Sequence, residues 1–298
     1  MAAVGTLHHH ATGKYATGYI IMKVCFYYRG VTIVAGSWLY VKQEHAAQLE
    51  IPFQKLTELA AEAIQGASLP MGFAVTVLFD AFYLCPKVAQ SCKVKGWHYI
   101  AVGKSNRWFT IGAVKRKLGR YGHNVLRNSD QWYSIAGLRT IRRYRLAQRV
   151  GRLNGLGMVK VVFSRRRRES KHIALVTDDL GASMRTIVAG YLKRWSIELL
   201  IKDQKQHSGL GDYRVRRYQA IVRHLRLVDV AYACLTHVAI KTCRAQSRNK
   251  SDRVLQLEPI SKLKDCIRQI VWQQNVQGVI KYSDEKPVVR RSERLLAA

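Results

Sequence analysis

The sequence predicts a mixed α/β fold, and three observations carry that prediction. Two runs rich in β-branched and aromatic residues, 18–29 and 31–41, meet at Arg29–Gly30, which is typical of a β-hairpin. Residues 51–67 repeat apolar side chains at helical spacing. An unbroken apolar run follows at 73–83, which is typical of a strand buried on both faces. Strands and helices alternating in this order indicate a mixed sheet with flanking helices.

The helix over 51–67 has boundary signals at both ends. Pro52 stands near its start, where a missing N–H costs nothing, and Gly66 and Pro70 are expected to end it.

The strand over 73–83 carries one acidic residue, Asp80, near its C-terminal end. A carboxylate is costly to bury unless it is paired or binds a metal. Ligand sites gather at the C-terminal ends of sheet strands, which favours a functional role. The alternative is a helix cap or an ion pair with a nearby lysine.

Residues 85–170 differ in character, because short β-type runs alternate there with basic turns. Four consecutive arginines, 165–168, and the interleaved Trp97, Trp108 and Trp132 predict a β-rich basic insertion that can lie along DNA. A tryptophan on such a sheet is still more often part of the core than a stacking platform. The predicted division is an N-terminal part of the core (1–84), the insertion (85–170), a C-terminal part of the core (171–243) and a helical tail (244–298).

A second buried strand is predicted at 172–179, followed by a helix at 187–211 that Ser183 or an upstream Asp could cap. Gly209 and Gly211 are expected to end it. Further helices are predicted over 218–242, which has a wide apolar face, and around 260–274.

The formal net charge of +31 indicates a polyanionic partner, most often nucleic acid. A membrane surface would call for a basic amphipathic helix or a lipidation signal, and the sequence shows neither. No apolar run reaches the ~18–20 residues of a membrane span. Six cysteines without CxxC spacing indicate reduced thiols and a cytoplasmic location, and no zinc-site spacing is present.

Five polar residues of the 187–211 helix are spaced 3, 4, 4 and 3 apart, which places them on one side: Tyr191, Arg194, Glu198, Lys202 and Lys205. Asp80 and Glu198 would suit two-metal phosphoryl transfer, with Arg194 and Lys205 gripping phosphates. The plainer interpretation is a set of i,i+4 ion pairs on a wet surface. The spacing alone does not separate the two.

The spacing Tyr191-x2-Arg194-x3-Glu198-x6-Lys205 resembles the Tyr-Arg-Glu-Lys signature of DDE-type insertion-sequence transposases. Trp195, Lys202 and GLGDYR at 209–214 resemble the surroundings of that family's third catalytic acid. VLFDAFY, 77–83, resembles the strand of the second acid, and HHHATGKYATGY, 8–19, resembles the segment shortly after the first.

This resemblance implies a ribonuclease-H-like mixed sheet with a β-rich insertion between the second and third acids. It implies DNA cleavage and strand transfer at element ends, dependent on Mg²⁺ or Mn²⁺. Asp80 and Glu198 would be the catalytic acids and metal ligands. The DNA contacts would be Tyr191, Arg194, Trp195, Lys202 and Lys205. The implied partners are element-end and target DNA, bound by a homodimer.

One departure from the family pattern is expected to matter. The first acid should lie on a strand before the hairpin, yet residues 1–43 contain no Asp or Glu, and Glu44 comes first. The first strand is therefore expected to be absent, which would make this an N-terminally truncated chain. Asp178 or Asp179 could lie near the site, although their order in the chain is wrong for a substitute. We expect DNA binding with poor cleavage; the alternatives are a non-catalytic DNA-binding relic or regulator, and a nuclease that does not transpose.

Overall fold

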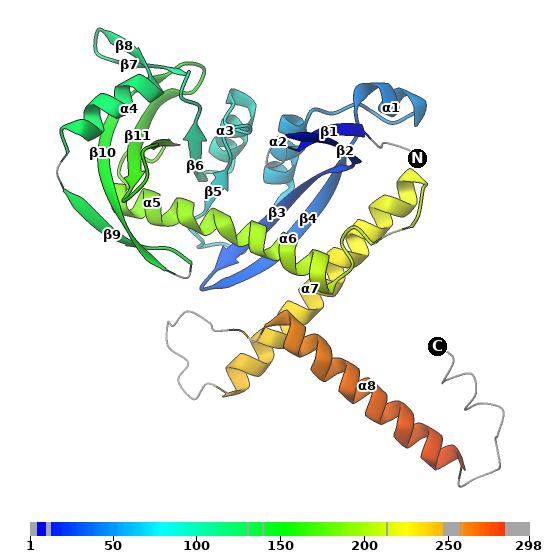
Figure 1. Cartoon of the computed structure of the whole chain (residues 1–298). Helices are drawn as coiled ribbons and strands as arrows, with labels where there is room; N and C mark the ends of the chain where they lie inside the picture. Colours follow the sequence, from blue (N-terminus) through cyan, green and yellow to red (C-terminus); the bar gives the residue numbers. More distant parts are fainter. Residues whose placement is uncertain are drawn as a thin grey trace.

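The computed structural model describes residues 5–9, 13–129, 131–138, 140–212, 214–246, 257 and 259–283 (Figure 1). Its strands are β1 (Gly5–His9), β2 (Lys14–Gly18), β3 (Ile20–Tyr28), β4 (Val31–Tyr40), β5 (Thr76–Phe79), β6 (His98–Gly103), β7 (Trp108–Ile111), β8 (Val114–Lys117), β9 (Trp132–Ala136), β10 (Ile141–Leu153), β11 (Gly157–Arg166) and β12 (Ile173–Thr177). Its helices are α1 (Gln43–Gln48), α2 (Leu56–Gly66), α3 (Pro86–Val94), α4 (Leu118–Arg127), α5 (Met184–Leu192), the 3₁₀ turn η1 (Lys193–Trp195), α6 (Ser196–His207), α7 (Tyr218–Gln246) and α8 (Ile260–Ser283).

The central element is an eight-stranded sheet with the order β5-β6-β12-β11-β10-β7-β8, and β9 also pairs with β10. β5 and β6 run parallel, whereas the pairs from β6 to β8 are antiparallel. The expected mixed α/β architecture is confirmed.

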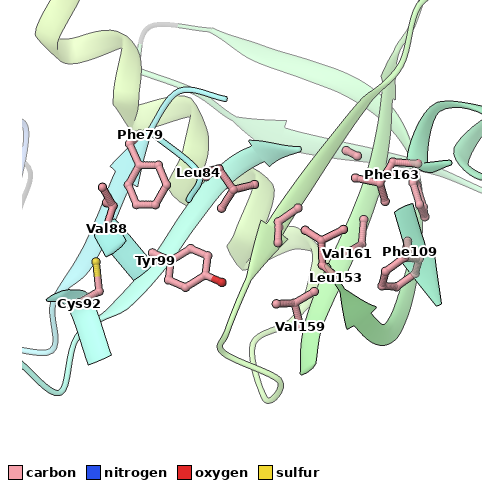
Figure 2. Packing of buried hydrophobic residues seen from close by; sticks show 14 of the residues in the cluster. Phe79, Leu84, Val88, Cys92, Tyr99, Phe109, Leu153, Val159, Val161 and Phe163 are labelled. Atoms are coloured by element: carbon pink, nitrogen blue, oxygen red, sulfur yellow. The ribbon is translucent and has the colours of Figure 1, made fainter. Parts of the chain in front are cut away.

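Helices cover both faces of this sheet. On one face, α3 and α4 enclose the larger core, in which Phe79, Tyr99 and Phe163 are among the buried aromatic residues (Figure 2). On the other face, Ile187 and Val188 of α5 pack against buried residues of β6, β11 and β12. α5 is therefore fixed directly on the sheet, close to the end of β5.

The predicted hairpin is confirmed as β3–β4. Arg29 and Gly30 have φ values of 49° and 89°, the positive pair that a tight two-residue hairpin turn requires. The hairpin forms its own two-stranded sheet and shares no ladder with the eight-stranded one within the described residues. Its two faces pack against α2 on one side and against α6 and α7 on the other. Helices, not strand pairing, thus hold it in place.

Several predicted boundaries are wrong. The 51–67 helix begins only at Leu56, because Glu58 accepts a hydrogen bond of 2.9 Å from the Lys55 N–H and caps the helix there. The 73–83 strand shrinks to β5, in which only Phe79 is buried, so it is not buried on both faces. Among the short β-type runs expected within 85–170, β9 and β10 lie close together in the sequence and pair with each other. Helix α4 was not predicted.

The segment 85–170 is β-rich as expected, but its strands are not a separate layer. β7 to β11 extend the sheet that begins with β5 and β6, and β12 inserts between β6 and β11. The domain boundaries at 84, 170 and 243 stay predictions.

The C-terminal helices follow the predicted pattern but are longer. α7 packs along β4, and the start of α8 packs on α6 and α7 through Ile260 and Leu263. Beyond this contact α8 extends away from the rest of the molecule (Figure 1). None of the helices in the described part of the chain is long and apolar enough to cross a membrane. Residues 284–298 of the predicted tail lie outside the described residues.

Candidate active site

The predicted helix over 187–211 is not one continuous α-helix. It consists of α5, the 3₁₀ turn η1 and α6, which ends at His207. Ser183 caps α5 as predicted, since its Oγ accepts a hydrogen bond of 3.1 Å from the Thr186 N–H. Gly209 and Gly211, with φ of 74° and 101°, follow the end of α6. The 3₁₀ turn leaves Tyr191, Arg194 and Glu198 on a common side.

Four of the predicted site residues meet at the end of β5. Asp80 directly follows the strand, and its Oδ1 lies 3.5 Å from the Tyr191 hydroxyl and 3.3 Å from Arg194 Nη1. Arg194 Nη2 donates to Glu198 Oε1 at 2.8 Å. The guanidinium of Arg194 therefore bridges Asp80 and Glu198, which we call the carboxylate pair.

Asp80 is more exposed than the apolar run around it predicts. The side chain of Asp80 is 58% exposed and that of Glu198 is 38% exposed, whereas that of Arg194 is 20% exposed. Asp80 is therefore not a charge buried inside a strand. Its carboxylate is open to solvent.

Tyr191 is the most desolvated member of the cluster. Burial raises the pKa of its phenol to about 12; the charge of Asp80 acts in the same direction, and Arg194 opposes it. Burial by itself would lower the pKa of Arg194, but Tyr191, Asp80 and Glu198 together raise it. At neutral pH Tyr191 is thus a hydrogen-bond donor and Arg194 a cation.

The remaining predicted residues lie near this cluster without joining it. Lys202 and Lys205 are exposed on α6, about 6 Å and about 10 Å beyond Glu198 along the helix axis. Trp195, in η1, is 55% exposed. These side chains extend the polar side of α6 away from the carboxylate pair.

Two features that position the site were not predicted. Lys193 of η1 places its ammonium 5.7 Å from the ring centre of Tyr27 on β3. Gln204 of α6 donates at 3.0 Å to Asp229 of α7, which also forms an ion pair with Lys23. These contacts fix η1 and α6 against the hairpin. The sequence hinted at the second contact only through Lys23, a single lysine among the β-type residues 20–28.

Asp178 and Asp179 lie at the other end of the sheet. Asp178 accepts a hydrogen bond from the Tyr99 N–H at 3.0 Å and lies 3.4 Å from His98. His98 pairs with Thr76, the first residue of β5. Asp80 follows the last residue of β5, roughly 13 Å farther along the strand direction. Asp178 therefore lies apart from the carboxylate pair.

The carboxylate pair suits a divalent metal ion in its chemistry. Mg²⁺ prefers oxygen ligands and is often held by one or two carboxylates together with substrate phosphates. Within the described residues, no group of three or more His, Cys, Asp or Glu side chains is placed to hold a metal. The pair therefore fits as the protein's share of a site that a phosphate completes, provided that Arg194 moves aside.

No curated protein matches the chain. A family model described as the transposase DDE domain matches residues 58–234, more than half of the sequence. The match includes the carboxylate pair and both elements that carry it. The chain belongs to the transposase DDE-domain family.

Proposed function

We propose that the chain binds the DNA ends of an insertion element through the Tyr191–Arg194–Glu198 side of α5, η1 and α6. The observation that carries this proposal is the position of Arg194 between Asp80 and Glu198. A guanidinium binds carboxylate and phosphate oxygens by the same forked geometry, so it can exchange one for the other. A phosphate arriving at the site offers Arg194 a new partner and releases both carboxylates.

Asp80 and Glu198 are proposed as the residues that would hold Mg²⁺ or Mn²⁺. When bound there, the metal would polarise a phosphodiester and lower the pKa of a bound water. Tyr191, protonated at neutral pH, would donate a hydrogen bond to a phosphate oxygen. Trp195, Lys202 and Lys205 are exposed beside it and would contact the DNA backbone farther along α6.

We further propose that strand cleavage by this chain is weak or absent. Two observations support this. The structure brings two acidic side chains together at the end of β5, and residues 1–43 supply no candidate for a third.

Assembly is the remaining part of the proposal. Element ends are handled in pairs in the family that the sequence resembles, so we propose a homodimer on paired DNA ends. Sedimentation of the chain with and without duplex DNA would test it, and a monomer in both conditions would contradict it.

The test of the function uses the purified 298-residue chain and labelled duplexes taken from the DNA flanking its coding sequence. We expect binding that weakens steeply with salt, and little nicking in Mg²⁺ or Mn²⁺. Glu198→Gln and Asp80→Asn are the site variants, and Glu169→Gln, at an exposed ion pair with Arg166, is the control. Robust nicking that Glu198→Gln abolishes would overturn the proposed impairment. Absence of duplex binding would overturn the proposed function itself.

A further inference from the structure

The β7–β8 hairpin presents a surface that the candidate active site does not use. The register pairs Trp108 with Lys117 and Thr110 with Lys115, and it pairs Thr110 with Arg152 of β10. Residues paired across an antiparallel ladder point to the same side of the sheet. Trp108, Lys115, Lys117 and Arg152 therefore share one face, and we call these four residues the outer basic surface.

This face is the one that α5 covers farther along the sheet. Along β10, Tyr144 and Leu146 pack towards α5, and Arg152 is on the same side because side chains alternate along a strand. All four residues of the outer basic surface are exposed, Trp108 by 44%. The eight-stranded sheet thus continues beyond its helical cover as a bare face, at the end where β7 and β8 lie (Figure 1).

The side chains on this face are ordered by contacts with one another. The ammonium groups of Lys115 and Lys117 lie 5.4 Å and 5.6 Å from the ring centre of Trp108. Cation–π contacts of this kind hold two positive charges close to an exposed indole. The two lysines are roughly 6.6 Å apart along the strand, comparable with two 3.4 Å steps along one DNA strand.

The hairpin beneath this face is firmly anchored. Phe109, between Trp108 and Thr110, is buried in the larger core with Leu153 and Leu118. Gly151 of β10 leaves no room for a Cβ against the Thr110 carbonyl and the Phe109 ring, so β7 lies unusually close to β10. The charges therefore sit on a rigid platform that loses little conformational entropy when a ligand binds.

The charge of this region selects the ligand. Between residues 85 and 168, Asp130 is the only acidic residue in a sequence dense in Lys and Arg. A face with cations and an aromatic ring but no acid is complementary to the phosphates of a nucleic acid. Lysine and arginine rows on a rigid strand suit the regular backbone of a duplex.

We propose that the outer basic surface is a second DNA-contact site, which grips the phosphodiester backbone of duplex DNA away from the carboxylate pair. β5 and β7 are five strand steps apart in the sheet order, which corresponds to about 24 Å. A duplex that follows the sheet from one site to the other would span about seven base pairs at 3.4 Å each. This inference rests on the proposed function, because it takes DNA as the partner.

The test compares two double variants with equal loss of charge. Lys115→Gln/Lys117→Gln removes the outer basic surface. Arg116→Gln/Arg120→Gln removes two exposed cations of the same segment, of which Arg116 points to the opposite face of β8. Affinity for a 30-base-pair duplex is measured by fluorescence anisotropy between 50 and 200 mM salt. Circular dichroism and the unfolding midpoint verify that both variants fold.

We expect Lys115→Gln/Lys117→Gln to weaken binding about tenfold at 0.1 M salt and to reduce the salt slope by about 1.8, as two lost phosphate contacts require. Lys115→Arg/Lys117→Arg should restore binding, and Arg116→Gln/Arg120→Gln should change it less than threefold. Equal losses in the two glutamine variants would overturn the inference while leaving the proposed function intact. Preferential displacement of the duplex by double-stranded RNA of the same sequence would also overturn it. Absence of binding by the unchanged chain would instead refute the proposed function.

Discussion

Lys23 and Asp229, which are 206 residues apart in the sequence, form an ion pair of 2.8 Å between side chains that are 2% and 11% exposed. Lys23 also donates to Ser37 on β4, and Gln204 of α6 donates to the same oxygen of Asp229. The pair therefore ties both strands of the hairpin to α6 and α7. It is a buried polar link between the hairpin and the helix that carries Glu198.

Breaking the ion pair between Lys23 and Asp229 should destabilise the folded chain. Lys23→Met leaves Asp229 buried and charged with only Gln204 to stabilise it, and should lower the free energy of unfolding by about 3–5 kcal/mol. Lys87→Met breaks an exposed ion pair with Glu58 and should cost at most about 1 kcal/mol. Urea unfolding measures both. Similar losses of unfolding free energy in the two variants would show that the buried pair stabilises the fold no more than the exposed one.

Arg194 should act in opposite directions on metal and DNA. In Arg194→Gln the guanidinium no longer competes for Asp80 and Glu198, so Mn²⁺ should bind more tightly in isothermal titration calorimetry. Duplex binding should weaken by roughly tenfold, since one charge-assisted contact is lost. Arg185→Gln, an exposed arginine of α5, is the control and should move neither value appreciably. A parallel loss of both ligands would argue against exchange of the guanidinium.

The cap of α5 should contribute measurable stability. Ser183→Ala removes the acceptor of the Thr186 N–H and should cost about 1 kcal/mol in urea unfolding. Ser183→Asp supplies a new acceptor and a favourable charge at the helix start, and should be close to neutral. Ser134→Ala, on the exposed side of β9, should stay within about 0.5 kcal/mol. Equal losses for alanine and aspartate at 183 would contradict a capping role.

Thiol reactivity should divide the cysteines into two groups. Burial raises the pKa of Cys25 to about 11 and that of Cys92 to about 12, whereas Cys234 and Cys266 are exposed. Because only the thiolate reacts, iodoacetamide at pH 8 should label Cys234 and Cys266 first. Mass spectrometry of native and urea-unfolded protein gives the comparison. Rapid labelling of Cys92 in the native protein would contradict its buried position.

The same pKa shift has a consequence for stability. The pKa of Cys25 is higher in the folded chain than its usual value of 9.0, so the folded state retains this proton longer. The stabilisation that the protonated Cys25 thiol contributes to the folded state is complete below pH 9 and is lost as the pH rises through about 11. Cys25→Ala should flatten the fall in unfolding free energy over that range. An unchanged pH profile would show that other groups dominate it.

The sequence predicted those parts of the fold that depend on local pattern. The hairpin turn follows from Arg29–Gly30, and the α5 cap follows from Ser183, because a few neighbouring residues determine each. The grouping of Asp80 with Tyr191, Arg194 and Glu198 came from the resemblance to DDE-type transposases, and the structure brings these four residues together.

What the sequence did not predict depends on distant contacts. Nothing local to Lys23 reveals that Asp229 will meet it, since the pair forms only when the hairpin packs on α7. Asp80 was expected to be buried because its neighbours are apolar, yet β5 is short and lies at the edge of its sheet. The break between α5 and α6 was not predicted either, because the turn that separates them contains no glycine or proline.

The 3₁₀ turn η1 connects two helices that pack on different sheets. α5 is packed on the eight-stranded sheet through Ile187 and Val188, whereas α6 is packed with the hairpin and α7 through Leu200 and Gln204. Asp80 follows a strand of the eight-stranded sheet, whereas Glu198 lies on the helix that packs with the hairpin. The distance between the two carboxylates therefore depends on how the sheet and the hairpin are oriented, and Arg194, in the turn between the two helices, links both acids.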